Sequence, residues 1–94
     1  MKRAARTDKN HTQIVSALRE LGFSVLSLAA VGKGCPDLLI GRHSRNYLIE
    51  VKDGTKCPSA RKLTDDQQKF YANWTGQMQV INSVEEVIEW ANGL

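Results

Sequence analysis

Three charged residues stand on two short apolar segments in the middle of the chain, and their types could hold a divalent metal ion. Asp37 opens the segment DLLIGR, and Glu50 and Lys52 lie in the segment YLIEVK. Two carboxylates supply the oxygen ligands that Mg²⁺ or Mn²⁺ prefers, and they leave coordination positions for water and a phosphate oxygen. A lysine two residues from such a glutamate can orient a water molecule or stabilise charge on a phosphate under attack. We therefore take Asp37, Glu50 and Lys52 as candidate catalytic residues for cleaving a phosphodiester bond.

Both segments are rich in aliphatic and β-branched residues, which predicts two strands joined by a hairpin turn at HSRN, residues 43–46. A tight turn centred there is expected to place Asp37 opposite Lys52 and Leu39 opposite Glu50. Glu50 and Lys52 then share one strand face, and Asp37 lies diagonal to Glu50 at roughly 7 Å. The alternative is an ordinary solvated face, which a Glu-x-Lys pair alone usually indicates. The otherwise apolar character of both strands favours the catalytic interpretation.

The composition bounds the class of protein. The 94 residues predict one domain, with 41% hydrophobic residues and no apolar run of the roughly 20 residues that a membrane span needs. The basic start of the chain lacks the apolar stretch of a signal peptide, so we expect a cytoplasmic protein of a bacterial or phage-infected cell, with residues 1–9 as a basic arm. Cys35 and Cys57 form no CxxC pair and no secretory signal precedes them, so we expect neither a structural zinc site nor a disulfide.

Positive charge is concentrated in the first two thirds of the chain. Residues 1–62 hold 12 Lys or Arg against 5 Asp or Glu, and residues 63–94 hold 1 against 5, so the two parts carry +7 and −4. A basic surface around a carboxylate pair suits a nucleic acid, whose phosphates must be held while one is cut. The candidate nucleic-acid-binding residues flank the predicted strands: Lys33, Lys56, Arg61 and Lys62. Solubility alone is the alternative explanation of this charge.

The rest of the pattern predicts an α/β domain with the order helix, three strands, helix, strand, helix, and a mixed sheet flanked by helices. The expected elements are a helix from about residue 8 or 10 to 21, strands at 23–29, 37–42, 47–52 and 78–81, and helices at 65–74 and 84–90. Thr64 with Gln67, and Ser83 with Glu86, have the spacing of capping boxes that begin the last two helices. Gln67 could face the sheet and contact the attacking water or a phosphate, or it could be a plain cap residue.

These motifs together resemble the PD-(D/E)xK nuclease superfamily, and within it the virus-type replication-repair nuclease (VRR-NUC) family in its small stand-alone phage form. The resemblance rests on GCPDLL at residues 34–39, LIEVK at 48–52 and LTDDQ at 63–67, and it covers nearly the whole chain. It implies a restriction-endonuclease-like core and metal-dependent cleavage of DNA. It also implies a homodimer that acts on branched DNA such as Holliday junctions. In such a site Asp37 and Glu50 would bind the metal together with the backbone carbonyl of Val51.

One departure concerns the first helix, where the family usually has a Glu and this chain aligns His11. An imidazole can bind a metal, although less naturally for Mg²⁺ than for Mn²⁺. His11 is therefore either a metal ligand or an exposed residue of the first helical turn. The departure also leaves open a second function, a DNA-structure-binding module that does not cleave.

Overall fold

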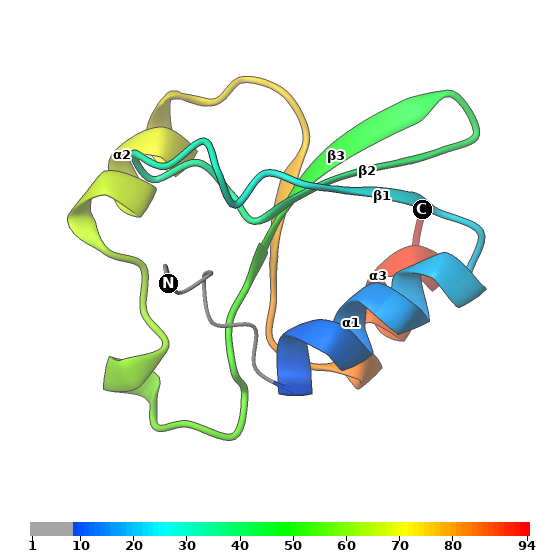
Figure 1. Cartoon of the computed structure of the whole chain (residues 1–94), viewed down its shortest axis with the longest axis horizontal. Coiled ribbons are helices and arrows are strands. Elements are labelled where there is room, and N and C mark those ends of the chain that lie inside the picture. Colours follow the sequence, from blue (N-terminus) through cyan, green and yellow to red (C-terminus); the bar gives the residue numbers. More distant parts are fainter. Residues whose placement is uncertain (1–8) are drawn as a thin grey trace, which may run out of the picture.

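The computed structural model describes residues 9–94, which form an α/β fold with the predicted order of elements (Figure 1). The elements are α1 (Lys9–Glu20), β1 (Ser24–Ser27), β2 (Leu38–Arg42), β3 (Arg45–Val51), the short 3₁₀ helix η1 (Pro58–Ala60), α2 (Asp65–Asn73), β4 (Met78–Ile81) and α3 (Val84–Asn92). The predicted fold class is thus confirmed. The basic arm expected at residues 1–9 lies, except for Lys9, outside the described residues.

The four strands form one mixed sheet in the order β1-β2-β3-β4. The first three strands pair antiparallel, and β4 pairs parallel to β3. A parallel neighbour requires a crossover connection, and here the crossover is the long segment that carries η1 and α2. The start of β2 and the end of β3 lie close to the start of α2.

One face of the sheet carries the hydrophobic core. Along β3, Tyr47 and Ile49 point to this face, and both are buried in the core cluster. Helices α1 and α3 contact each other and cover this face with the apolar sides of their turns (Figure 1). The remaining core residues come from both helices and from the sheet: Ile14, Ala17, Leu18, Phe23, Leu38, Ile40, Ile81, Val87 and Ala91. Because side chains alternate along a strand, Leu48 and Glu50 must point to the opposite face.

The hairpin between β2 and β3 differs from the predicted register by two residues. Arg42 pairs with Arg45 and Leu39 pairs with Leu48, so the expected pairing of Leu39 with Glu50 is wrong. The loop contains only His43 and Ser44, which both have positive φ, at 55° and 65°. Two left-handed residues are the geometry of a tight hairpin turn, but His-Ser is a much weaker signal for it than Asn-Gly.

The corrected register brings the two carboxylates closer than predicted. One step beyond the last paired residues, Asp37 comes opposite Glu50 instead of Lys52. A shift of two residues leaves every side chain on its original face, because the strand period is two. Asp37 therefore still shares the face of Glu50, as the sequence predicted, but lies directly across from it.

The ends of the helices follow the predicted caps closely. Thr64 and Gln67 form a full capping box at the start of α2. At α3, Ser83 accepts a hydrogen bond from the backbone N–H of Glu86, but the Glu86 carboxylate accepts from the backbone N–H of Asn82 and not of Ser83. The second capping box is therefore only half correct, because the glutamate reaches one residue further back.

Helix α1 ends one residue earlier than predicted, and strand β1 is shorter than predicted. Helix α1 ends at Glu20, and Gly22 with a φ of 93° turns the chain so that the Phe23 N–H bonds to the Leu18 carbonyl. Strand β1 covers Ser24–Ser27 instead of residues 23–29. No helix among the described residues is long and apolar enough to cross a membrane.

Candidate active site

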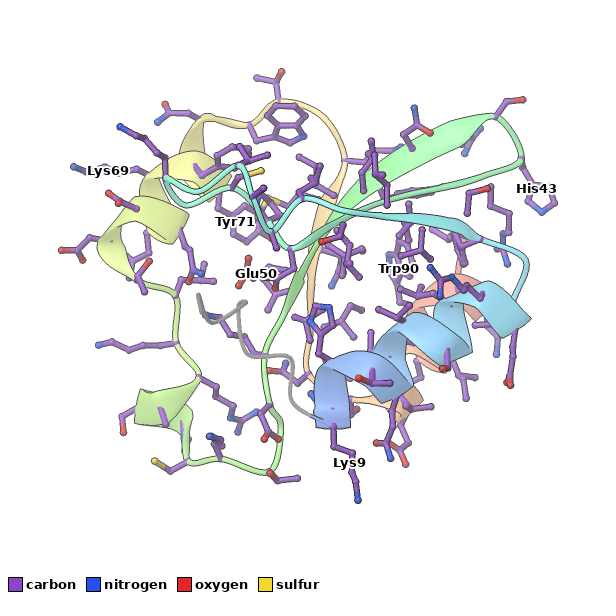
Figure 2. All side chains as sticks on the ribbon, in the orientation of Figure 1. Lys9, His43, Glu50, Lys69, Tyr71 and Trp90 are labelled. Carbon is purple, nitrogen blue, oxygen red and sulfur yellow. The ribbon has the colours of Figure 1, made fainter. Side chains whose placement is uncertain are left out.

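The second face of the sheet carries the charged residues singled out in the sequence. Figure 2 shows Glu50 on the α2 side of the strands and Trp90 on the opposite side, toward α1. Asp37, Glu50 and Lys52 meet on this face, where β2 begins and β3 ends. The three predicted catalytic residues are thus brought together by the hairpin.

Hydrogen bonds hold two of these side chains in place. The Asp37 carboxylate accepts a hydrogen bond of 2.7 Å from the backbone N–H of Val51 through Oδ2. The Lys52 ammonium lies 3.5 Å from Glu50 Oε2. Because Asp37 is bonded to the residue that separates Glu50 from Lys52, the three charges form one compact group.

Gln67 links this group to helix α2. Its side-chain Oε1 accepts hydrogen bonds of 2.9 Å from both Lys52 Nζ and the backbone N–H of Thr64. Its Nε2 donates to Glu50 Oε2 at 3.1 Å. The same amide therefore caps the helix and contacts both charged side chains, whereas its contact with the attacking water or a phosphate stays a prediction.

A close approach between the backbone at Gly34 and the first turn of α2 lets the helix lie near Glu50 and Lys52. A Cβ built on Gly34 would lie 2.4 Å from the Asp66 carbonyl oxygen and 2.9 Å from the Gln67 nitrogen, and Gly34 has a φ of 79°. Any other residue would both clash with the first turn of α2 and strain the backbone. Gly34 thus allows Gln67 to reach Glu50.

Glu50 is a buried carboxylate whose hydrogen-bonding capacity is only partly satisfied. It is 2% exposed, and its Oε1 has no hydrogen-bond partner among the described residues. Burial, and then the nearby charge of Asp37, raise the pKa of Glu50 to about 7, although Lys52 acts in the opposite direction. The site therefore holds more negative charge than its own lysine neutralises.

This arrangement fits a divalent cation on the side of Asp37 and Glu50. The unpartnered Oε1 and the mutual repulsion of two carboxylates are the conditions that a bound cation relieves. Among the described residues, no three His, Cys, Asp or Glu side chains gather where they could share one metal ion. The protein side chains of such a site would be the two carboxylates, and the carbonyl of Val51 stays a predicted third ligand.

His11 lies in the first turn of α1 and is partly buried, so it is not the fully exposed residue considered as the alternative. Its neighbour Asn10 donates a hydrogen bond of 2.7 Å to the Lys52 carbonyl. The start of α1 therefore adjoins the end of the strand that carries Glu50. The role of His11 as a ligand stays a prediction.

The candidate nucleic-acid-binding residues lie in two places. Lys56 and Lys62 are exposed on the connection between β3 and α2, whereas Arg61 is partly buried in a cleft that Glu85 and Glu86 also line. Lys33 is exposed in the loop before β2, which contacts the first turn of α2 through Gly34. The three lysines are thus accessible to solvent, while Arg61 lines a cleft together with two glutamates.

Two contributors to the site were missed in the sequence. The local pattern assigns Gly34 no role of its own, although the Gly-Lys-Gly run that it closes is a signal for positive φ. Residue 10 is predicted only as a possible start of the first helix. The bond from Asn10 to the Lys52 carbonyl joins residues 42 apart in the chain, which no local pattern indicates.

Comparison with known proteins finds no matching family model, no matching curated protein and no matching solved structure.

Proposed function

We propose that this protein is a metal-dependent DNA endonuclease of the PD-(D/E)xK superfamily, of the VRR-NUC type, which hydrolyses phosphodiester bonds in branched DNA such as Holliday junctions. The observation that supports it best is the Glu50 carboxylate, buried beside Asp37 with an oxygen that lacks a partner among the described residues. Burying an incompletely paired carboxylate costs free energy, which packing alone does not explain. A Mg²⁺ or Mn²⁺ ion held by Asp37 and Glu50 would offset that cost.

When bound, the ion polarises the phosphate and lowers the pKa of water. The side chains of the protein would orient the reacting groups. Lys52 places a positive charge within 3.5 Å of Glu50 Oε2, where it can orient the attacking water or stabilise the charge that builds up on phosphorus. Gln67 keeps the ammonium and the Glu50 carboxylate in fixed positions relative to each other. A preorganised group of this kind loses little free energy to reordering when the substrate reacts.

Binding of the DNA backbone is assigned to the exposed lysines beside the site. Lys33, Lys56 and Lys62 would contact phosphates without reading sequence, since ammonium groups on mobile stems act as point charges. Arg61 was predicted with them, and we propose for it a weaker contribution because it shares a cleft with Glu85 and Glu86. Such contacts suit recognition of DNA shape. A cytoplasmic location, where DNA is accessible, belongs to the same proposal.

A cleavage assay tests the assignment. Purified protein is incubated with a labelled four-way junction or linear duplex, with Mg²⁺, Mn²⁺ or EDTA. We expect cleavage only with metal, and a loss of at least about 100-fold in rate for Glu50→Gln and Lys52→Ala, since both remove charge from the reacting centre. Glu89→Gln, which changes an exposed glutamate on α3, serves as the matched control. Equal cutting by all variants would show that the activity belongs to another site or to a contaminant.

The same assay distinguishes cleavage from the second function that His11 leaves open, which is DNA binding without cleavage. A non-cleaving DNA-binding module predicts metal-independent binding of the junction without product. His11→Glu, which introduces the oxygen ligand usual in the family, should raise the rate with Mg²⁺ relative to the rate with Mn²⁺ if residue 11 is a ligand. An unchanged ratio would remove His11 from the metal site.

We further propose that the active form is a homodimer. A four-way junction has approximate two-fold symmetry and needs paired cuts, whereas each chain offers one candidate site, so two copies related by a two-fold axis are expected. Light scattering of the free protein and of its mixture with junction DNA measures this directly. A mass near 10.5 kDa for the protein component in both samples would contradict it.

A further inference from the structure

We propose that a groove on α2, beside the candidate active site, binds an unpaired nucleotide of the DNA substrate, with the base stacked on Trp74 and the phosphates held by Lys33 and Lys69. This inference rests on the proposed nuclease function and specifies the class of DNA that the site takes. The groove has a volume of about 500 Å³, and its lining consists of Lys33, Asp66, Lys69, Phe70, Asn73 and Trp74.

The aromatic residues of this groove are not part of the hydrophobic core. Helix α2 has no buried residue, and neither Phe70 nor Trp74 belongs to the core cluster or packs against it. Trp74 is 46% exposed, which is high for the largest apolar side chain. The core therefore does not account for a tryptophan at this position.

The Trp74 ring is nevertheless held in a defined orientation. The rings of Phe70 and Trp74 stack with centroids 5.4 Å apart and an interplanar angle of 17°. Gly76 approaches the indole so closely that a Cβ there would lie 2.8 Å from its Nε1. A ring fixed in this way offers a preformed surface, so that a ligand stacking on it loses less free energy to ordering the side chain.

The charges around the ring suit a nucleotide. Lys33 and Lys69 line the groove from two different elements, the loop before β2 and helix α2, and Asp66 is the acidic residue of the lining. Figure 2 shows Lys69 pointing outward from α2, away from Glu50. An exposed aromatic ring between cationic side chains is the arrangement with which proteins bind single-stranded nucleic acid, through base stacking and phosphate contacts.

The base must be unpaired, because the faces of paired bases inside a duplex are covered by their neighbours. Branched DNA with a single-stranded flap or tail exposes such bases, whereas a fully paired four-way junction does not, so the groove would select flapped and tailed forms over continuous duplex.

The groove and the candidate active site share the first turn of α2. Asp66 and Phe70 lie on one side of the helix, and Gln67 is rotated from them toward Glu50. Trp74 follows Gln67 by seven residues, which is about 10 Å along a helix axis. The unpaired nucleotide would therefore lie on the same helix as the residue that orients Glu50 and Lys52, close to the scissile phosphate.

Binding without metal, measured by fluorescence anisotropy, tests the groove apart from cleavage. The probes are a labelled duplex, the same duplex with a single-stranded tail, and the tailed duplex with abasic sites in the tail. For the tailed duplex we expect Trp74→Ala to weaken binding about tenfold, and Trp74→Phe to keep most of the affinity, because stacking needs an aromatic ring. For the fully paired duplex the change should stay below about twofold. Ile88→Ala, at a residue of 44% exposure on α3, is the matched control.

The abasic tail supplies a comparison that needs no variant. Wild-type protein should bind the abasic tail about as weakly as Trp74→Ala binds the normal tail. Equal affinity of the wild type for normal and abasic tails would overturn the stacking proposal, and so would an equal loss on paired and tailed DNA. A wild-type protein that binds no DNA at all would instead overturn the proposed function. Thermal unfolding of each variant confirms that the fold is retained.

Discussion

The two faces of the sheet are built on opposite principles. On the face toward α1 and α3, Ile49 is completely buried among apolar side chains. On the other face, the next residue, Glu50, is also almost completely buried, but it is charged and one of its oxygens lacks a partner among the described residues. Adjacent residues of one strand thus differ in their effect on stability. Burial of Ile49 stabilises the fold, whereas burial of the incompletely paired Glu50 carboxylate costs free energy that a bound cation would offset.

The cover of the two faces differs as well. Helices α1 and α3 pack on the core face through buried residues in both helices. Helix α2 has no buried residue, and it is held at the second face by the hydrogen bonds of Gln67 and by the contact of its first turn with Gly34. A helix attached through polar contacts can adjust to a substrate at a small cost in stability.

The largest effect is expected from truncating the core face. Ile49→Ala should lower the free energy of unfolding by about 2–5 kcal/mol, because it leaves a cavity in a fully packed site. Leu48→Ala, one residue away on the other face, should cost less, since Leu48 is buried but lies outside the core cluster and keeps 7% exposure. Urea unfolding followed by circular dichroism measures both. Equal losses would mean that the two faces contribute alike to stability.

A second effect concerns the pH dependence of the metal-free protein. The pKa of Glu50 is raised to about 7 from an ordinary value near 4.5, so the folded state binds this proton more tightly than the unfolded state. Stability from this group is therefore fully present below about pH 4.5 and is lost as the pH rises toward 7. Glu50→Gln removes this titration. The free energy of unfolding of Glu50→Gln should therefore rise relative to that of wild type across this pH range, by up to a few kcal/mol.

The measurement is chemical unfolding in EDTA from pH 4.5 to 8, with Glu89→Gln as the control for loss of an exposed carboxylate. Mg²⁺ at millimolar concentration should then stabilise wild type at pH 8 but not Glu50→Gln, because only the former offers the carboxylate pair. A wild-type pH profile parallel to that of Glu50→Gln would show that Glu50 titrates normally.

A more selective effect, on helix α2 and on cleavage, is expected in the loop before β2. Gly34→Ala should displace the first turn of α2, because its Cβ would meet the Asp66 carbonyl. Gly32→Ala is the matched control: Gly32 also has positive φ, at 75°, but a Cβ there would meet no atom within 4 Å. Both variants should lose about 1 kcal/mol to backbone strain, and Gly34→Ala should lose more because its Cβ also meets a backbone atom of α2. Only Gly34→Ala should also speed amide hydrogen exchange in α2 and lower cleavage at least about tenfold; equal behaviour of the two would separate Gly34 from the site.

The sequence by itself determined the order of the elements and the cap of α2. Hydrophobic periodicity indicated the α/β class and the order of helices and strands, and the Thr64 and Gln67 spacing marked the start of α2 correctly. The shared face of Asp37, Glu50 and Lys52 was also predictable, because alternation along a strand survives a register error of two residues. These features depend on neighbours a few positions apart, which a sequence displays directly.

Only the tertiary structure decided how these parts meet. The two-residue turn at His43 and Ser44 placed Asp37 across from Glu50, although neither residue is a strong turn former. The approach of Gly34 to α2 turned a capping glutamine into the bridge between Glu50 and Lys52. The burial that raises the pKa of Glu50 follows from this closure. Such properties depend on distances between segments far apart in the chain, and those distances are set by packing, which local residue preferences do not encode.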